Sequence, residues 1–293
     1  MEQWLIQPGD TLVLELDDVR TLKTSLLGGQ VDVIGHDSPT TRIEVHSVAG
    51  KELEITQNGS ALEVDHPQLR WDNFIDVFRN WRLSGARADV SIAVPRDVAL
   101  TLGVVSASAL VAGLARPARL NTVSGDIMVD GCAGHLELNG VGAELSVRGH
   151  DGPLTAHTVS GDITVTGALS RVTTETVSGD VVIDSTVARS TITANAVSGN
   201  VVVRLHSDTG CRYTINTISG RLQLDDGTPI RVSGHGHTGT TGSPAGDWAE
   251  LRAKTVSGNI TVLHVADAPT APGQPAGPGE PAGPAGHPQG ATA

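Results

Sequence analysis

Hydrophobic and polar residues alternate in six similar stretches of this 293-residue chain, each directly after a glycine. In every stretch the second and fourth residues after the glycine are aliphatic, and the residue between them is mostly more polar. A period of two is typical of a β-strand with one buried face. The sequence therefore predicts strands with buried positions at Ile127/Val129, Ile163/Val165, Val181/Ile183, Val201/Val203, Leu222/Leu224 and Ile260/Val262.

These strands belong to a longer repeat, which reads NTVSGDIMVDG, HTVSGDITVTG, ETVSGDVVIDS, NAVSGNVVVRL, NTISGRLQLDD and KTVSGNITVLH. The common glycines are separated by 36, 18, 20, 21 and 38 residues. Gly142 divides the first long interval, Ala107 extends the series backwards by 18 residues, and residues 27–35 match it again. The last interval, from Gly220 to Gly258, is expected to hold a degenerate coil and an insertion. Self-similarity at such intervals is the signature of stacked structural units.

A repeat of this length predicts an all-β solenoid, a parallel β-helix with roughly 18–21 residues per coil. It holds two or three strands and their corners but no crossover helix, so each strand pairs with its equivalent one coil away. The Val-Ser-Gly triplet is expected at a corner, because glycine tolerates a positive φ. The aliphatic residues of this triplet are expected to form an internal ladder: Val123, Val159, Val177, Val197, Ile218 and Val256.

The solenoid domain is predicted to cover residues 1–266, with degenerate coils in 1–100 and clear repeats in 100–266. A short helix is predicted over residues 68–82, as a cap on one end or flank, from the one-face spacing of Trp71, Phe74, Ile75, Phe78 and Trp81. A partner-binding or membrane-surface helix is the alternative. Residues 267–293, rich in Pro, Gly and Ala, predict a disordered tail.

The candidate site residues are the repeated turns, which place a serine before each glycine and, in most copies, an Asp or Asn after it. We interpret them as structural, with each Asp or Asn side chain hydrogen-bonded to its own turn. Asp162 and Asp180, on adjacent coils, would also be spaced for glycosidase chemistry or for calcium, but Arg221 occupies the same position in another copy. No catalytic, metal or cofactor residue is therefore predicted. The turn residues are Ser124, Gly125, Asp126, Ser160, Gly161, Asp162, Ser178, Gly179, Asp180, Ser198, Gly199, Asn200, Ser219, Gly220, Ser257, Gly258 and Asn259.

The amino-acid composition limits the kinds of core, partner and metal site that the chain can have. The chain has only four Trp, two Phe and one Tyr, which fits a narrow interior filled by aliphatic ladders. Its net charge is −12, so nucleic acid is not expected as a partner. Cys132 and Cys211 have no metal-site or disulfide spacing and are expected to be small packing residues. His235 and His237 are expected in a solvated loop insertion, with metal binding as the alternative.

The N-terminal sequence MEQWLIQPGDTLVLEL lacks the pattern of a secretory signal. Cytoplasmic localisation is therefore expected, with envelope association as the alternative. Residues 98–115 carry no charge and are long enough to span a membrane. Because this run contains Ser106 and Ser108, and Ala107 is in register with the later glycines, we expect a buried coil and no transmembrane segment.

The repeated T-V-S-G-D-[IV]-x-[VI] pattern, preceded by VSIAVPRD at residues 90–97, resembles the bacterial β-strand-repeat family of putative adhesins, a domain of unknown function. The resemblance covers roughly residues 25–265 and implies a right-handed β-helix with a surface or envelope role, in some members linked to envelope stress. The first hypothesis is a non-catalytic structural or binding protein that presents a polar surface to a protein or glycan. The alternatives are a polysaccharide-active lyase or hydrolase and an intracellular scaffold. The partner and the oligomeric state are left open by the sequence.

Overall fold

The computed structural model describes residues 1–66, 85–207, 209–225, 227, 230–232, 236–241 and 248–265. Within these residues the chain forms 23 strands in one continuous sheet and no helix. The predicted helix over 68–82 and the predicted tail over 267–293 lie outside the described residues. The strands are β1 (Glu2–Ile6), β2 (Leu12–Leu16), β3 (Thr21–Leu26), β4 (Gly29–His36), β5 (Thr41–Ala49), β6 (Leu53–Asn58), β7 (Ala61–Asp65), β8 (Arg87–Pro95), β9 (Ala99–Val104), β10 (Ser108–Ala112), β11 (Ala118–Thr122), β12 (Ile127–Asp130), β13 (Leu136–Asn139), β14 (Leu145–Ser160), β15 (Ile163–Ser178), β16 (Val181–Ser185), β17 (Thr191–Ser198), β18 (Val201–His206), β19 (Gly210–Leu224), β20 (Ile230–Val232), β21 (His237–Thr241), β22 (Trp248–Ser257) and β23 (Ile260–Val265).

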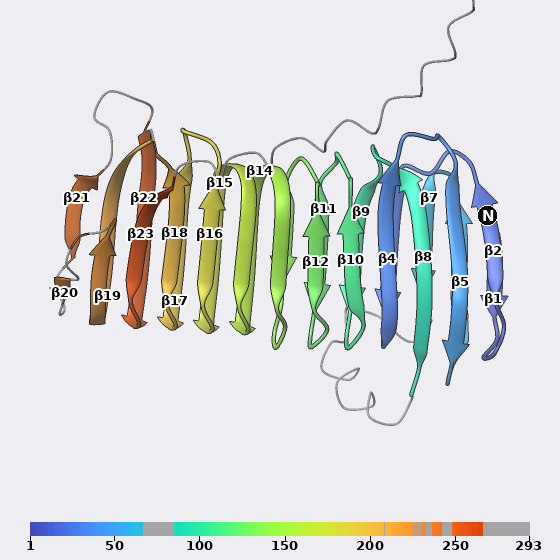
Figure 1. Cartoon of the computed structure of the whole chain (residues 1–293). Coiled ribbons are helices and arrows are strands. Elements are labelled where there is room, and N and C mark those ends of the chain that lie inside the picture. Colours follow the sequence, from blue (N-terminus) through green and yellow to red (C-terminus); the bar gives the residue numbers. More distant parts are fainter. Residues whose placement is uncertain are drawn as a thin grey trace, which may run out of the picture.

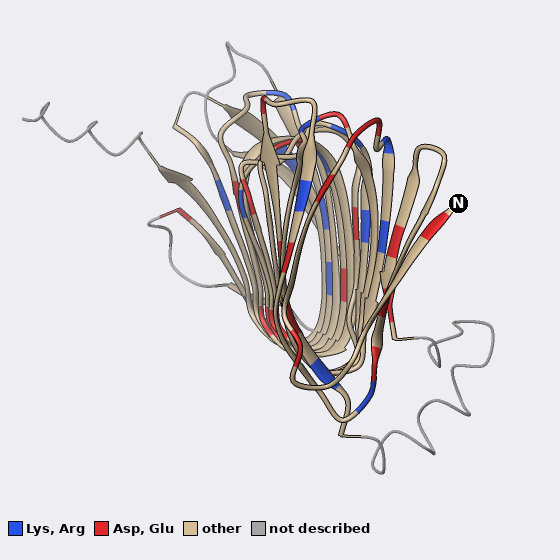
Figure 2. Cartoon of the chain, turned by 90° about the vertical axis from the view of Figure 1, so that its right-hand side faces the viewer, with Lys and Arg blue, Asp and Glu red and all other residues tan. Residues whose placement is uncertain are grey.

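The sheet folds into two walls, because most coils place one strand in each wall. The long strands β14, β15 and β19 cross from one wall to the other. Viewed along the axis, successive coils surround a common interior (Figure 2), and viewed from the side their strands lie side by side (Figure 1). Pairing orders the first wall as β1, β6, β7, β3, β9, β11, β13, β14, β15, β17, β22, β19 and β21. It orders the second wall as β2, β5, β8, β4, β10, β12, β14, β15, β16, β18, β23, β19 and β20.

The central coils stack in parallel with the predicted period. Ala118 pairs with Leu136 and Leu136 with Leu154, each 18 residues further on. Val172 pairs with Ile192 after 20 residues. An all-β solenoid of coils close to the predicted length is therefore confirmed, and residues 27–35 lie in register with it, since β4 pairs in parallel with β10.

One coil near each end of the solenoid is inserted out of sequence order. The coil of β3 and β4 lies between β7/β8 and β9/β10. The coil of β22 and β23 lies between β17/β18 and β19. The prediction that a degenerate coil fills the interval from Gly220 to Gly258 is wrong: β20 and β21 pair antiparallel with β19, and the chain then returns inside the stack. Sequence order and spatial order therefore differ at both ends.

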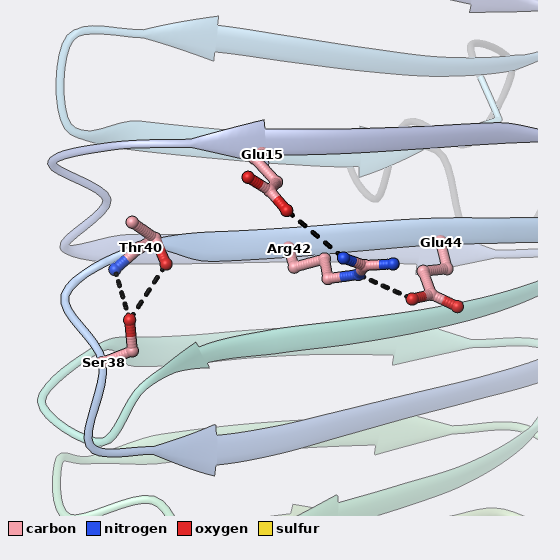
Figure 3. A network of polar contacts seen from close by, with 5 residues as sticks. All are labelled: Glu15, Ser38, Thr40, Arg42 and Glu44. Atoms are coloured by element: carbon pink, nitrogen blue, oxygen red, sulfur yellow. Dashed lines mark hydrogen bonds and ion pairs between the residues drawn. The ribbon is translucent and has the colours of Figure 1, made fainter.

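Antiparallel strands form the described ends of the stack, in place of the wholly parallel coils predicted. At the N-terminal end β1 pairs with β6 and β2 with β5. Across the latter pair Arg42 forms ion pairs with Glu44, at 2.7 Å, and with Glu15, at 3.2 Å, while Ser38 and Thr40 bond to each other at the preceding turn (Figure 3). The neighbouring carboxylates, Glu44 foremost, raise the pKa of Arg42. These groups are exposed, so they add little to stability.

The interior is built from aliphatic ladders, as predicted. The alternating residues after each glycine are fully buried from Ile127 to Val262, and only Leu224 is partly buried. Residues 98–115 include β9 and β10, and most of their aliphatic side chains, such as Leu100, Leu102 and Val111, are buried, which confirms a buried coil. Cys132 and Cys211 are buried free thiols, as expected. In the part of the chain that the structure describes, no helix has the length and apolar character needed to cross a membrane.

Candidate functional site

The repeat glycines stack directly on one another at the bend between the two walls. A Cβ built on Gly161 would lie 2.0 Å from the carbonyl oxygen of Ala143, and one on Gly179 would lie 2.1 Å from that of Gly161. Gly161 and Gly179 also have φ values of +143° and +147°, which side-chain-bearing residues rarely adopt. At these two positions glycine is therefore favoured by close approach of the coils and by backbone conformation together.

The order of this column corrects two details of the predicted register. Gly258 stacks on Gly199 and Gly220 stacks on Gly258, because the coil of β22 and β23 is inserted there. Gly142, expected in the column, lies one residue outside it. The column position in that coil is Ala143, which follows from the contact made by Gly161.

The Asp and Asn side chains after the glycines link neighbouring coils. An Oδ1 of Asp162 accepts a hydrogen bond from the backbone N–H of Asp180, at 2.8 Å, and Asp180 accepts one from Asn200, at 2.7 Å. Asn200 and Asn259 continue the row by accepting from the next backbone N–H at 3.1 Å. The expectation that each side chain caps its own turn is therefore wrong, because the acceptor reaches the equivalent residue one coil away. A neutral amide can replace the carboxylate, which explains why Asn alternates with Asp.

These hydrogen bonds involve the same aspartates that were considered above for glycosidase chemistry or calcium binding. Asp126 accepts the backbone N–H of Glu144 at 3.1 Å, and Asp162 accepts that of Asp180, so one oxygen of each carboxylate is already engaged. No group of three or more His, Cys, Asp or Glu side chains within the described residues is arranged to hold a metal ion. The serines line the same bend, where Ser124 Oγ donates to the carbonyl of Val105 at 3.0 Å.

The aliphatic residues of the Val-Ser-Gly triplets lie outside the solenoid, contrary to prediction. Among the six, only Val123 is buried, in a small cluster with Leu27, Ala86 and Val105. The other five and the equivalent Val141 have 44–61% of their surface exposed. Together they form an apolar ladder on the outer surface of the first wall, in the spatial order Val141, Val159, Val177, Val197, Val256 and Ile218.

The ladder faces outward because the alternation of buried residues changes phase at the bend. Along β14 the inward residues are Leu154, Ala156 and Thr158, so Val159 points out. Threonine suits the inward position at the bend: in the equivalent Thr122 the hydroxyl accepts from the N–H of Gly125, at 3.1 Å, and donates to its carbonyl, at 2.6 Å. The signal that could have revealed this was the small or threonine residue that precedes the aliphatic residue in every copy.

A polar row runs beside the apolar ladder and encloses with it a groove of about 770 Å³. On β14 and β15, His157 Nδ1 lies 3.2 Å from a carboxylate oxygen of Glu175, and Asn195 on β17 donates to Glu175 at 3.4 Å. Lys254 on β22 and Asn216 on β19 complete the row. The described groove-lining side chains are aliphatic, hydroxyl, amide, imidazole and charged, and none of them is Phe, Tyr or Trp.

Of the two histidines considered as metal ligands, His235 lies outside the described residues, so the structure describes only His237. His237 begins β21, so the predicted loop is a strand at this point, and its ring stacks on Tyr213 with a centroid distance of 5.9 Å.

The fold and surface define an all-β solenoid protein with an exposed apolar ladder along one wall. Residues 26–263 match the Toastrack DUF4097 family, a domain of unknown function. The chain belongs to this family.

Several solved bacterial structures are similar. A putative adhesin from Bacteroides fragilis is 14% identical with a TM-score of 0.42, and its comparison covers 88% of this chain and 100% of that one. A putative adhesin from Parabacteroides distasonis is 12% identical with a TM-score of 0.42, covering 88% and 99%. A putative lipid binding protein from the same species is 12% identical with a TM-score of 0.38, covering 88% and 99%. Comparison with curated proteins gives no match. Likeness at these values carries no argument about what the chain binds.

Proposed function

We propose that this chain is a non-catalytic binding protein whose binding surface is the outer face of the first wall from β14 to β19. The observation that supports the proposal is the exposed apolar ladder. The aliphatic residues two and four positions after each repeat glycine are buried, except for the partly buried Leu224, whereas the ladder exposes one aliphatic residue on every coil at intervals of about 4.8 Å. Contiguous exposed apolar surface with a polar rim is typical of interaction sites.

A protein fits this surface better than a glycan. The ladder offers aliphatic methyl groups, and the neighbouring row offers amide and charged groups, a combination that resembles the apolar core and polar rim of protein interfaces. Among the described residues that line it, the groove has no Phe, Tyr or Trp ring to stack on a sugar face. The carboxylates that would serve a polysaccharide-active enzyme are held in the hydrogen-bonded row at the bend.

In-cell photo-crosslinking tests this proposal. A photoreactive amino acid is placed at Val177, in the ladder, and in a matched variant at Met128, which is 41% exposed on the second wall. The proposal predicts a discrete crosslinked species from position 177 and none from position 128. Absence of a species at 177, or equal crosslinking at both positions, would contradict it.

We also propose that the coils wind in the right-handed sense. Strands β11 and β13 are parallel neighbours in one wall and are connected through β12 in the other. Connections of this kind between parallel strands of one sheet are right-handed in almost all proteins. An experimental electron-density map would show the handedness directly, and left-handed coils would contradict the proposal.

A further inference from the structure

The outer face of the first wall is self-complementary about β17. The strands β14, β15, β17, β22 and β19 lie side by side in that order, with β17 in the middle (Figure 1). Their outward residues form four columns across the strands, and the register fixes which residues are equivalent. In this order the columns are Pro153, Arg171, Thr191, Glu250 and Arg212; Thr155, Thr173, Thr193, Arg252 and Thr214; His157, Glu175, Asn195, Lys254 and Asn216; and Val159, Val177, Val197, Val256 and Ile218.

We infer that the partner covering this face is a second copy of the chain, an inference that rests on the proposed binding surface. Two copies placed face to face, with a two-fold axis along β17, bring β15 of one opposite β22 of the other. This is an isologous interface, so every contact occurs twice. Each column of one copy lies opposite the same column of the other copy, and the strands of the second copy follow one another in the reverse order.

Charges match in this arrangement. Glu175 comes opposite Lys254 of the second copy, and Arg171 comes opposite Glu250, each pair formed twice. Within the described part of its own chain, neither Arg171 nor Lys254 has an ion-pair partner. The central strand contributes only Thr191, Thr193, Asn195 and Val197, which are uncharged and meet themselves on the axis.

Apolar and hydroxyl groups match as well. Val177 comes opposite Val256, and Val159 opposite Ile218, so the exposed ladder is covered along its length. Thr155 and Thr173 come opposite Thr214 and Arg252. The long side chains of Glu175 and Lys254 line the groove, where each can reach the facing copy.

The size of the face agrees with a weak to moderate dimer. Five strands about 4.8 Å apart and four columns about 6.6 Å apart cover roughly 600 Å² per copy, or about 1,200 Å² in total. That value lies at the lower end of stable, specific interfaces. The face carries four cations and two acids, so a net charge of +2 meets the same +2 on the second copy. Arg212 and Arg252 have no facing acid, and Arg252 is paired with Glu250 of its own chain at 2.7 Å.

Sedimentation velocity of the full chain over a series of concentrations tests the inference through charge reversal. Glu175→Lys alone and Lys254→Glu alone each place like charges opposite one another twice, so each is expected to weaken dimerisation by at least about tenfold. A mixture of the two variants places opposite charges together at both positions, so it is expected to form a mixed dimer about as stable as the wild-type dimer. Met128→Lys, on the second wall, is the matched control and leaves dimerisation unchanged. Circular dichroism melting shows that each variant is folded.

Three results would overturn the inference: a wild-type chain that is monomeric throughout, a dimer that neither charge reversal affects, or two variants that fail to associate when mixed. A monomeric chain that still crosslinks from position 177 to a different protein would overturn the second copy as partner but leave the proposed function in place. A dimer rescued by mixing, and a crosslinked species of twice the chain mass, would support both.

Discussion

Substitution of Gly179 by alanine probes the contact on which the stack depends. The new Cβ would lie 2.1 Å from the carbonyl oxygen of Gly161 and 2.6 Å from its carbon, in a backbone conformation with φ of +147°. A Cβ atom essentially never lies within 3.0 Å of a backbone oxygen on another strand, so the two coils must separate locally by about 1 Å. The nearby bonds are Gly179 N–H to the carbonyl of Ser198, at 3.1 Å, and Asp180 N–H to Asp162, at 2.8 Å.

The cost can be estimated from these contacts. Weakening these two hydrogen bonds costs about 1 kcal/mol each. The unfavourable φ adds about 1–3 kcal/mol. We therefore expect Gly179→Ala to lower the free energy of unfolding by about 3–5 kcal/mol, a large part of the total for an ordinary domain.

Urea unfolding followed by circular dichroism measures this value, and Gly131→Ala is the matched control. Gly131 has a φ of +57° but no atom within 4 Å of a built Cβ, so the substitution carries backbone strain without the collision. The expected loss for the control is about 1–2 kcal/mol. If Gly179→Ala were no more destabilising than Gly131→Ala, close stacking of the glycines would be refuted.

Two further predictions concern the bend and the buried histidine. Asp162→Asn keeps the oxygen that accepts the N–H of Asp180, so its free energy of unfolding should stay within about 0.5 kcal/mol of the wild-type value. Asp162→Ala should lower the free energy of unfolding by about 1 kcal/mol, as measured by urea unfolding. Equal effects of the two substitutions would argue against the hydrogen bond between coils. Burial lowers the pKa of His66 from 6.5 to about 4, so the folded state binds its proton less readily than the unfolded state. The wild-type chain should therefore lose stability as the pH falls from about 6.5 towards 4, by up to roughly 3 kcal/mol, as measured by melting at several pH values. His66→Leu should remove this part of the pH dependence, the exposed His135→Gln should not, and an unchanged slope in His66→Leu would contradict the assignment.

The alternating strands and the coil length could be predicted because both are local properties. Ile163 and Val165 share a face through the period of the strand alone, and coils of nearly equal length can only place equivalent strands side by side. The same reasoning located residues 27–35 in the stack. The order of the coils at the ends could not be predicted, because the contact of Gly258 with Gly199 joins residues that other coils separate in the sequence.

There is a physical reason why the sequence pattern predicted the apolar ladder inside the solenoid and not on its surface. Counting back from Ile163 with a constant period of two puts Val159 inside, but the bend at Gly161 changes the phase. Counting forward from Leu154 would have placed Thr158 inside and Val159 outside. The self-complementary charges of Glu175 and Lys254 depend on the inserted coil, so the repeat alone could not reveal them.

The claim that the apolar ladder lies on the outside is tested most directly by thiol labelling at two adjacent positions. The native Cys132 and Cys211 are 3% and 0% exposed, so they give little background under native conditions. In Val177→Cys the new thiol replaces a side chain that is 49% exposed, and in Thr176→Cys one that is 4% exposed. At a chain concentration low enough for the monomer to predominate, we predict that a maleimide labels the folded Val177→Cys variant at least about a hundredfold faster than Thr176→Cys, because reaction at 176 requires local opening of a coil. Equal rates in the folded state, or faster labelling at 176, would contradict the account.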